Sequence, residues 1–277
     1  MIRTATQLKA KVRNLSGGDS KKARTLIRNF IMERFLERIA LSQYRNNFIL
    51  KGGMLVAAVV GLDTRATMDI DTTVKSMNLT KDNAVKIVEE IIAVNLDDGV
   101  QFQITKVMDI MEEHDYPGIR FMLEATLDKI RQAVKIDIFT GDVITPRAVE
   151  YSYHLMFEDR VISLWTYNLE TLLVEKLETI MARGTANTRM RDFYDIHVIS
   201  HQEAFDREIL KKAFLTTSAK RNTTDQIPDF RDILSTVEAD ASMKKQWDSF
   251  REDSFFVGEL SWNEVMASVK VLAEVVL

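Results

Sequence analysis

The chain has 277 residues, of which 46% are hydrophobic, and a formal net charge of −4. This size and composition allow one large or two modest domains and argue against global disorder, and the overall charge gives no sign of a nucleic-acid partner. The absence of cysteine excludes disulfides, thiolate metal sites and cysteine nucleophiles, and it fits the cytoplasm, where we expect the protein. We find no signal-peptide pattern and no apolar run near the ~18–20 residues that cross a membrane, so no membrane association is expected.

The apolar periodicity of the first 160 residues predicts an α+β domain. It begins with a helical segment over residues 1–45, in which Ser20 is the expected N-cap of the clearest helix. A connection over residues 112–118 is expected between two of the strands. The predicted strands cover 46–51, 67–74, 100–110, 118–127 and 133–139, and the predicted helices cover 20–41, 52–61 and 80–96, the last capped by Thr80.

Residues 161–277 are predicted to form an all-helical C-terminal domain that contributes active-site residues. A short element at 161–167 begins this domain, and no convincing strand pattern follows it. Because no segment rich in proline and glycine separates the two domains, we expect them to pack closely. The predicted helices cover 168–183, 189–202, 207–221, 229–252 and 261–277.

Two carboxylates, Asp69 and Asp71, interrupt an otherwise apolar strand. Residues i and i+2 of a strand project from one face, so their oxygens can converge on a hard cation such as Mg²⁺ or Mn²⁺. Asp137 has the same apolar setting in the strand at 133–139. If the two strands are neighbours, three carboxylates line one pocket and form the ligand set of a two-metal phosphoryl-transfer site. Acids that face solvent at strand ends are the alternative interpretation.

A glycine pair, Gly52-Gly53, stands between the first predicted strand and the next helix. Such a pair lets backbone N–H groups approach a phosphate closely, and a helix N-terminus favours an anion. An ordinary tight turn is the alternative. The order of glycine pair, D-x-D and later strand aspartate indicates a nucleotide site more strongly than any one part does.

These motifs resemble those of the DNA polymerase-β-type nucleotidyltransferase fold, which implies a mixed β-sheet flanked by helices. They read K-G-G at 51–53, R-x-T-x-D-I-D at 65–71 and K-I-D-I at 135–138. The segment "EKLETIMARGTANTRMRDFYDIHVI", residues 175–199, resembles more specifically the AbiEii/AbiGii toxin family. That family is the toxin half of bacterial type IV toxin–antitoxin and phage abortive-infection systems. The resemblance covers residues 48–200.

The second half of the chain places charged residues on apolar helix faces. Lys176 lies on such a stripe, where a lysine costs desolvation unless it meets an anion such as a triphosphate or a nearby acid. Asp192 also falls on an apolar face, whereas Arg191 and Asp195 are spaced as an ordinary i,i+4 ion pair. The resemblance implies that Lys176 and Asp192 are active-site residues, and that Arg189, Arg191 and Asp195 support nucleotide or RNA phosphate.

Four further residues flank the motifs. Arg65 and Thr67 precede the D-x-D and are expected to touch phosphates at the mouth of the site, although Arg65 fits a solvent-facing loop equally well. Lys51 and Lys135 are expected to point away from the glycines and carboxylates, and we interpret both as structural.

Other chemical signals are weak. His197 and His201 have an i,i+4 spacing that zinc sites use, but no H-E-x-x-H pattern accompanies them, which favours an ordinary helix surface. Neither a G-x-S-x-G motif nor a P-loop is present. A basic cluster near the N-terminus can hold RNA phosphates or form a solvated helix face. It comprises Lys9, Lys11, Arg13, Lys21, Lys22, Arg24 and Arg28.

The resemblance implies an enzyme that moves a nucleotide from an NTP to an RNA hydroxyl and releases pyrophosphate. The tRNA 3′ end is the expected acceptor, and its blockage would arrest translation. In this hypothesis Asp69 and Asp71 hold Mg²⁺ or Mn²⁺, and Asp137 completes the site and helps to deprotonate the attacking hydroxyl. Gly52 and Gly53 seat the β- and γ-phosphates, which Lys176 neutralises.

Two alternatives stay open at this point. One is a nucleotidyltransferase or phosphotransferase on the same fold that modifies a protein. The other is a non-catalytic module that binds a nucleotide or a partner, although the three intact carboxylates argue against it. The resemblance also implies a cognate antitoxin, which in this family is a separate winged-helix regulator that need not touch the toxin.

Overall fold

The structure of the protein is a computed structural model and describes residues 1–110 and 118–277. The chain divides into two compact units. The first unit comprises residues 1–58, 66–142 and 149–166, and the second comprises residues 59–65, 143–148 and 167–277.

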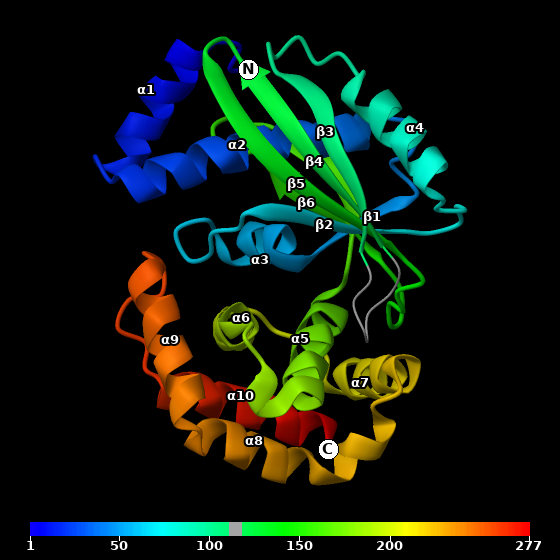
Figure 1. Cartoon of the computed structure of the whole chain (residues 1–277), viewed down its shortest axis with the longest axis vertical. Helices are drawn as coiled ribbons and strands as arrows, with labels where there is room; N and C mark the ends of the chain where they lie inside the picture. Colours follow the sequence, from blue (N-terminus) through cyan, green and yellow to red (C-terminus); the bar gives the residue numbers. More distant parts are fainter. Residues whose placement is uncertain (111–117) are drawn as a thin grey trace. The chain divides into compact units, whose positions relative to one another are not determined.

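A seven-stranded mixed sheet forms the centre of the first unit, in the order β3-β4-β5-β2-β1-β7-β6 (Figure 1). The pairs β1–β7 and β2–β5 are parallel, and the other described neighbours are antiparallel. This confirms the expected mixed sheet. The strands are β1 Phe48–Lys51, β2 Asp69–Val74, β3 Gln101–Ile110, β4 Gly118–Leu127, β5 Ile130–Thr140, β6 Val149–His154 and β7 Val161–Thr166.

Helices cover this sheet and supply its core. α2 packs against β5 and β7, and α4 packs against β3 and α2. The side chains of Ile70, Ile136 and Ile138 are fully buried, and they alternate along their strands with the acids singled out above. The acids therefore lie on the other face. The helices are α1 Ala5–Ser16, α2 Ser20–Leu41, α3 Gly52–Val60 and α4 Lys81–Ile92.

The second half of α2 is buried on all sides, so its charged side chains need internal partners. Arg38 binds both oxygens of Asp98 at 2.9 and 3.0 Å and also donates to the carbonyl of Val100 at 2.8 Å. Glu37 pairs with Arg160, which follows β6 in the chain. These contacts fix α2 to the loops around the sheet.

The second unit is helical and takes in two short segments from earlier in the chain. The Tyr194 hydroxyl donates to the carbonyl of Thr64 at 2.6 Å, and the amide of Asn168 donates to the carbonyl of Thr145 at 2.7 Å. α5 packs against α6 and α7, and α10 packs against α6, α7 and α8. The helices are α5 Leu169–Arg183, α6 Met190–Gln202, α7 Arg207–Arg221, α8 Phe230–Ala239, α9 Ala241–Asp253 and α10 Trp262–Val276.

Two helix boundaries differ from the prediction because aspartates cap the helices. The N-cap of α2 is Asp19 rather than Ser20, since the Asp19 carboxylate accepts from the backbone N–H groups of Lys21 and Lys22. The single helix predicted over 229–252 is two helices, because Asp240 ends α8 and caps α9. The Thr80 cap of α4 and the helix start at Gly52 are confirmed.

The strand assignments also differ in two places. β6 lacks a predicted counterpart, and the segment 161–166 is not part of the helical unit but a sheet strand, because it pairs with both β1 and β6. The boundary between the compact units therefore falls after residue 166 rather than after residue 160. The assignment of a separate function to each domain stays a prediction. The connection expected at 112–118, with His114, lies outside the described residues except for Gly118.

Candidate active site

The register of β2 and β5 brings the three predicted carboxylates together. Asp71 lies directly opposite Asp137 in this parallel pair, and Asp69 lies two residues before Asp71. Directly opposed residues, and residues two apart, project from the same face of a sheet. The condition set by the sequence, that the two strands are neighbours, is therefore met, and the acids gather on one face of the sheet.

Two cations lie against these acids. Lys135 forms an ion pair with Asp69, and its ammonium also lies 3.9 Å from an oxygen of Asp137. The Arg120 guanidinium binds both oxygens of Asp137, at 2.8 and 2.7 Å. The expectation that Lys135 points away is wrong, because Lys135 and Asp137 are two apart in β5 and share a face.

Gly52 is required by the position of Asp71. Lys51, the last residue of β1, is opposite Asp71, so the chain enters α3 beside that carboxylate. Gly52 has a φ of +64°, and a Cβ built on it would lie 2.1 Å from an Asp71 oxygen. Any side chain at position 52 would therefore displace the carboxylate. The glycine pair stands beside the acids, as the sequence pattern suggested, and its phosphate role stays a prediction.

The pKa of Asp71 is raised to about 7. Burial is the largest cause, and the negative charges of Asp69 and Asp137 add to it, while Lys51 and Lys135 act in the opposite direction. Lys51 compensates only partly, because its ammonium binds Asp142 at 2.5 Å and lies 4.7 Å from the centre of the Phe139 ring. These contacts support the structural interpretation of Lys51, but the expectation that it points away from the carboxylates is wrong, because Lys51 lies opposite Asp71 and shares its face of the sheet.

The donor set of this cluster suits a divalent cation. Mg²⁺ and Mn²⁺ bind carboxylate oxygens, and here three carboxylates face two cationic side chains, which leaves negative charge over. Lys135 and Arg120 occupy oxygens of Asp69 and Asp137. In residues 1–110 and 118–277, no three Asp, Glu, His or Cys side chains are arranged as metal ligands.

Thr67 lies at the entry to β2. Its side chain is buried, and its hydroxyl lies 3.3 Å from the Asp69 carbonyl and 3.5 Å from an Asp69 carboxylate oxygen. Thr67 therefore contacts the acidic cluster through Asp69.

A second charged cluster lies in the helical unit, between α5 and α6. Lys176 is buried, and its ammonium lies 3.1 Å from Asp192 and 2.7 Å from Asp195. Arg65 binds both oxygens of Asp195, at 2.5 and 3.2 Å. Arg189, which is exposed, contacts the second oxygen of Asp192 at 2.7 Å. The alternative that we considered for Lys176, a structural pair with a nearby acid, is thus observed within this unit.

The charges in this cluster support one another. Burial opposes the charge on Lys176, but the carboxylates of Asp195 and Asp192 outweigh it and raise the lysine pKa. Burial likewise opposes the charge on Asp195, but Arg65 and Lys176 outweigh it and lower the Asp195 pKa to about 2. Lys176 and Asp195 therefore both carry their charges at neutral pH.

The positions of Arg65 and Asp195 differ from the simplest expectations. Arg65 is buried and belongs to the second unit, so it is not a solvent-facing loop residue. Asp195 is completely buried and forms ion pairs with Lys176 and Arg65. These pairs differ from the i,i+4 pair with Arg191 that the spacing suggested. Arg191 is half-buried on α6, one residue before Asp192.

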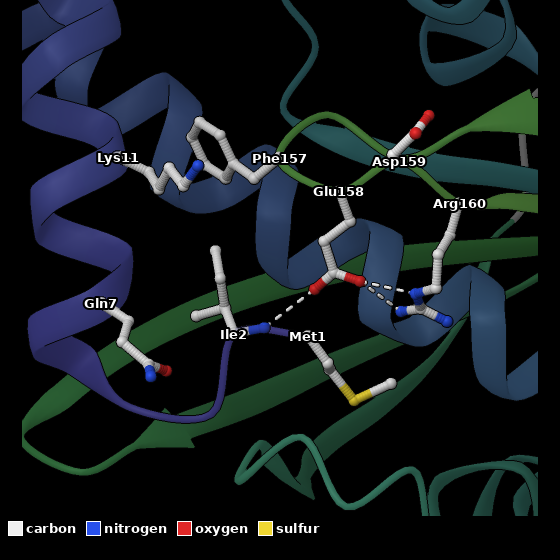
Figure 2. Close-up of a pocket in the computed structure, with 8 residues that line it drawn as sticks. All are labelled: Met1, Ile2, Gln7, Lys11, Phe157, Glu158, Asp159 and Arg160. Carbon is white, nitrogen blue, oxygen red and sulfur yellow. Dashed lines mark hydrogen bonds and ion pairs between the residues drawn. The ribbon is translucent and has the colours of Figure 1, made fainter.

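A separate pocket in the first unit has a volume of about 380 Å³ and is lined by none of the predicted site residues. It lies between the N-terminal segment and the turn between β6 and β7. Figure 2 shows that Glu158 connects the two segments that line the pocket. Its carboxylate accepts a hydrogen bond from the backbone N–H of Ile2 at 2.9 Å and forms an ion pair with Arg160. Lys11 lies over this pocket beside Phe157.

Comparison with known proteins identifies the family. Residues 34–268 match the family model described as nucleotidyl transferase AbiEii toxin, type IV toxin–antitoxin system. The chain belongs to the AbiEii family. As a member it is a nucleotidyltransferase, and its family implies an NTP substrate and an antitoxin partner. Every predicted site residue lies within the part that matches the AbiEii model.

One solved structure shares the overall fold of this chain. JHP933 from Helicobacter pylori is 15% identical, with a TM-score of 0.50 and coverage of 91% of each chain. An antigenic nucleotidyltransferase-like protein from Paracoccidioides brasiliensis is 14% identical, with a TM-score of 0.43 and coverage of 75% of this chain and 93% of the other. No curated protein matches.

Of the helices in the described part of this AbiEii protein, none is both long and apolar enough to cross a membrane.

Arg120 is the contact that sequence reasoning missed in this AbiEii protein. Its position opposite Asp137 depends on the register of β4 and β5, which pairs residues 17 apart in the chain. Lys135 was recognisable, because the i, i+2 spacing to Asp137 is visible in the sequence. For Arg120 the only signal in the sequence is the alternating pattern of β4. That pattern does not show which residue of β5 lies opposite Arg120.

Proposed function

We propose that this AbiEii-family protein transfers a nucleotide from an NTP to the 3′-terminal hydroxyl of tRNA. The observation that carries the proposal is the register that sets Asp71 opposite Asp137 with Asp69 on the same face. Modification of the tRNA end would stop translation, and within a toxin–antitoxin pair this would act as phage defence.

The proposed reaction is a displacement at phosphorus. The acceptor hydroxyl oxygen forms a bond to the α-phosphorus of the NTP, and the bond from that phosphorus to the bridging oxygen of the β-phosphate breaks. Pyrophosphate leaves with the electron pair, and the hydroxyl proton passes to a carboxylate. Rate enhancement in such a reaction comes mainly from positioning and charge stabilisation.

In this proposal Asp69, Asp71 and Asp137 hold Mg²⁺ or Mn²⁺. The cation, when bound, supplies positive charge to the triphosphate. Lys135 and Arg120 occupy the same carboxylate oxygens in the present structure. With those oxygens holding the cation, Lys135 and Arg120 would bind phosphate oxygens on the same face of the sheet.

Asp137 would be the proton acceptor in this proposal. Arg120 donates one hydrogen bond to each Asp137 oxygen, and each carboxylate oxygen keeps a further lone pair that could take the proton of the hydroxyl. Gly52 and Gly53 would seat the β- and γ-phosphates at the N-terminus of α3.

The charged cluster of the helical unit is assigned to the same reaction. Lys176 and Asp192 would act as active-site residues, and Arg65, Arg189 and Arg191 would bind nucleotide or RNA phosphate with Asp195 in support. Thr67, which contacts Asp69 in the first unit, would also bind phosphate. The buried ammonium of Lys176 supports this assignment, because it is held charged by two aspartates and would contribute a fixed cation. The antitoxin in this proposal is a separate regulator that need not contact the toxin.

The acceptor is tested by labelling. The protein is incubated with Mg²⁺ and each of four α-³²P-labelled NTPs, with purified tRNA, total RNA or total cell protein as the acceptor. We expect label in tRNA, mapped by ribonuclease digestion to the 3′-terminal fragment. Label that enters only protein would contradict the tRNA proposal and favour a protein-modifying enzyme.

A further inference from the structure

The N-terminal residues carry a charge opposite to that of the rest of the chain. Residues 1–28 contain eight Lys or Arg and a single acid, Asp19, which gives a charge of +7. The whole chain carries −4, so the remaining residues, with 29 basic and 40 acidic side chains, carry −11. Such a local concentration of positive charge is the electrostatic footprint of a polyanion-binding surface.

The structure arranges these charges in rows on two helices. α1 and α2 pack against each other and are joined through Gly17 and Gly18. On α1, Lys9 and Arg13 are four residues apart and lie on one side of the helix. On α2, a second row has the i, i+3, i+7 spacing of one helix face. The two rows, here called the basic hairpin surface, comprise Lys9, Arg13, Lys21, Arg24 and Arg28.

Four of these five side chains are available to a ligand. Lys9, Arg13 and Arg24 are exposed and Arg28 is half-buried, and none of the four forms an ion pair with a described residue. The nearby acid, Asp19, is engaged by backbone N–H groups as the N-cap of α2. Other basic residues of the segment serve elsewhere: Arg3 pairs with Asp97 at 2.7 Å, and Lys11 lies over the pocket of Figure 2.

We infer that the basic hairpin surface binds the phosphate backbone of the acceptor RNA. The inference rests on the proposed function, and it adds where that RNA is held. α2 packs on β5, the strand that carries Asp137, so the surface belongs to the same unit as the acidic cluster. The surface also precedes residues 34–268, the part that matches the family model.

The observations favour RNA over an anionic membrane. A helix that lies on a membrane needs an apolar face to insert into the lipid. The apolar residues of α1 with that spacing, Leu8 and Val12, are buried within the unit, as are Leu26 and Phe30 of α2. The basic hairpin surface is therefore charged but has no free apolar face, which suits the phosphates of RNA better than a lipid surface.

The test uses a charge-removal variant of the full chain and a matched control. The variant carries Lys9→Gln, Arg13→Gln, Arg24→Gln and Arg28→Gln. The control removes four exposed positive charges from α7 and α9, with Lys211→Gln, Lys212→Gln, Lys244→Gln and Lys245→Gln. Binding of fluorescently labelled bulk tRNA is measured without NTP from 50 to 200 mM KCl. Thermal unfolding confirms that both proteins are folded.

We expect the hairpin variant to bind tRNA at least about tenfold more weakly at the lower salt concentrations, with a slope of log affinity against log salt that is smaller by about three. The control should keep the wild-type slope within about one unit. Equal losses in both variants, an unchanged slope in the hairpin variant, or hairpin-dependent binding to phosphatidylglycerol vesicles but not to tRNA would overturn the inference. Failure of the proposed function is a separate result, namely no nucleotide transfer to RNA by the wild-type protein.

Discussion

Asp71 is the residue at which the electrostatics of the sheet cluster converge. Asp69 and Asp137 each have a cationic partner, Lys135 and Arg120, whereas Asp71 forms no ion pair with a described residue. Burial, together with the negative charges of Asp69 and Asp137, therefore raises the pKa of Asp71. A cation bound by the three carboxylates would remove this imbalance, which makes Asp71 the most informative position to change.

The pH dependence of stability should report the state of Asp71. Its pKa is about 7 in the folded protein and has its ordinary low value when unfolded, so the folded state retains a proton that the unfolded state loses. Stability should therefore fall as the pH rises from about 4 to 7. We predict that Asp71→Asn reduces this fall by on the order of 2 kcal/mol between pH 5 and pH 8.

Urea unfolding in the presence of a chelator at the two pH values measures this difference. Glu33, whose pKa burial raises to about 8, changes stability in the same direction. Glu33 is present in both proteins, so its contribution cancels in the comparison. The same pH dependence in wild type and Asp71→Asn would show that Asp71 is ionised throughout this range.

Gly52 tests the geometry around the same carboxylate. In Gly52→Ala the new Cβ would overlap Asp71, whereas in Gly17→Ala a similar positive φ is strained but nothing lies within 4 Å. We predict a loss of stability of about 1 kcal/mol for Gly17→Ala and of about 2 kcal/mol or more for Gly52→Ala. Only Gly52→Ala should also lose Mn²⁺-dependent NTP binding, measured by calorimetry. Equal NTP affinity in the two variants would contradict the close approach of Asp71 to the helix start.

The helix pair α5–α6 is held by charge as well as by apolar packing. Lys176→Met would leave the carboxylates of Asp192 and Asp195 buried without the cation between them. We predict a loss of about 3–5 kcal/mol in the free energy of unfolding, measured with urea. Adding Asp192→Asn removes one of the two charges and should restore part of that loss.

The double variant also separates structure from catalysis. If Lys176 and Asp192 are active-site residues, Lys176→Met with Asp192→Asn should regain stability but show no nucleotide transfer. A double variant that regains both stability and transfer would assign the pair a structural role only.

At the level of elements, local signals were predictable and register was not. The Thr80 cap, the helix start at Gly52 and the acid-bearing strands follow from patterns within a few residues. The pairing of β2 with β5 joins residues 66 apart in the chain. From the sequence we could therefore predict the three-carboxylate site only on the condition that these two strands are neighbours. β6 was missed because four of its six residues are exposed, which leaves little apolar alternation.

At the scale of the whole molecule, the predicted charged site residues fall into two clusters of described residues, one in each compact unit. From the family resemblance we expected the residues of both clusters to form a single site. The structure describes the contacts of each cluster within its own unit. If both groups serve one reaction, loss of either should abolish toxicity. We predict that cells which induce Asp71→Ala or Asp192→Ala grow as uninduced cells do, while wild type arrests growth. Western blots for equal protein levels are the control, and full toxicity of either variant would separate that cluster from the activity.

The central claim is that the carboxylates assembled by β2 and β5 perform nucleotidyl transfer. Its most direct test is the single-turnover rate of transfer from labelled NTP to tRNA, for wild type, Asp71→Asn and the control Asp109→Asn. Asp109 is an exposed carboxylate on β3 that pairs only with Lys81 among the described residues, at 3.4 Å. We predict a rate for Asp71→Asn that is lower by on the order of 10³-fold, with Asp109→Asn near wild type. A rate for Asp71→Asn within about twofold of wild type would contradict the account.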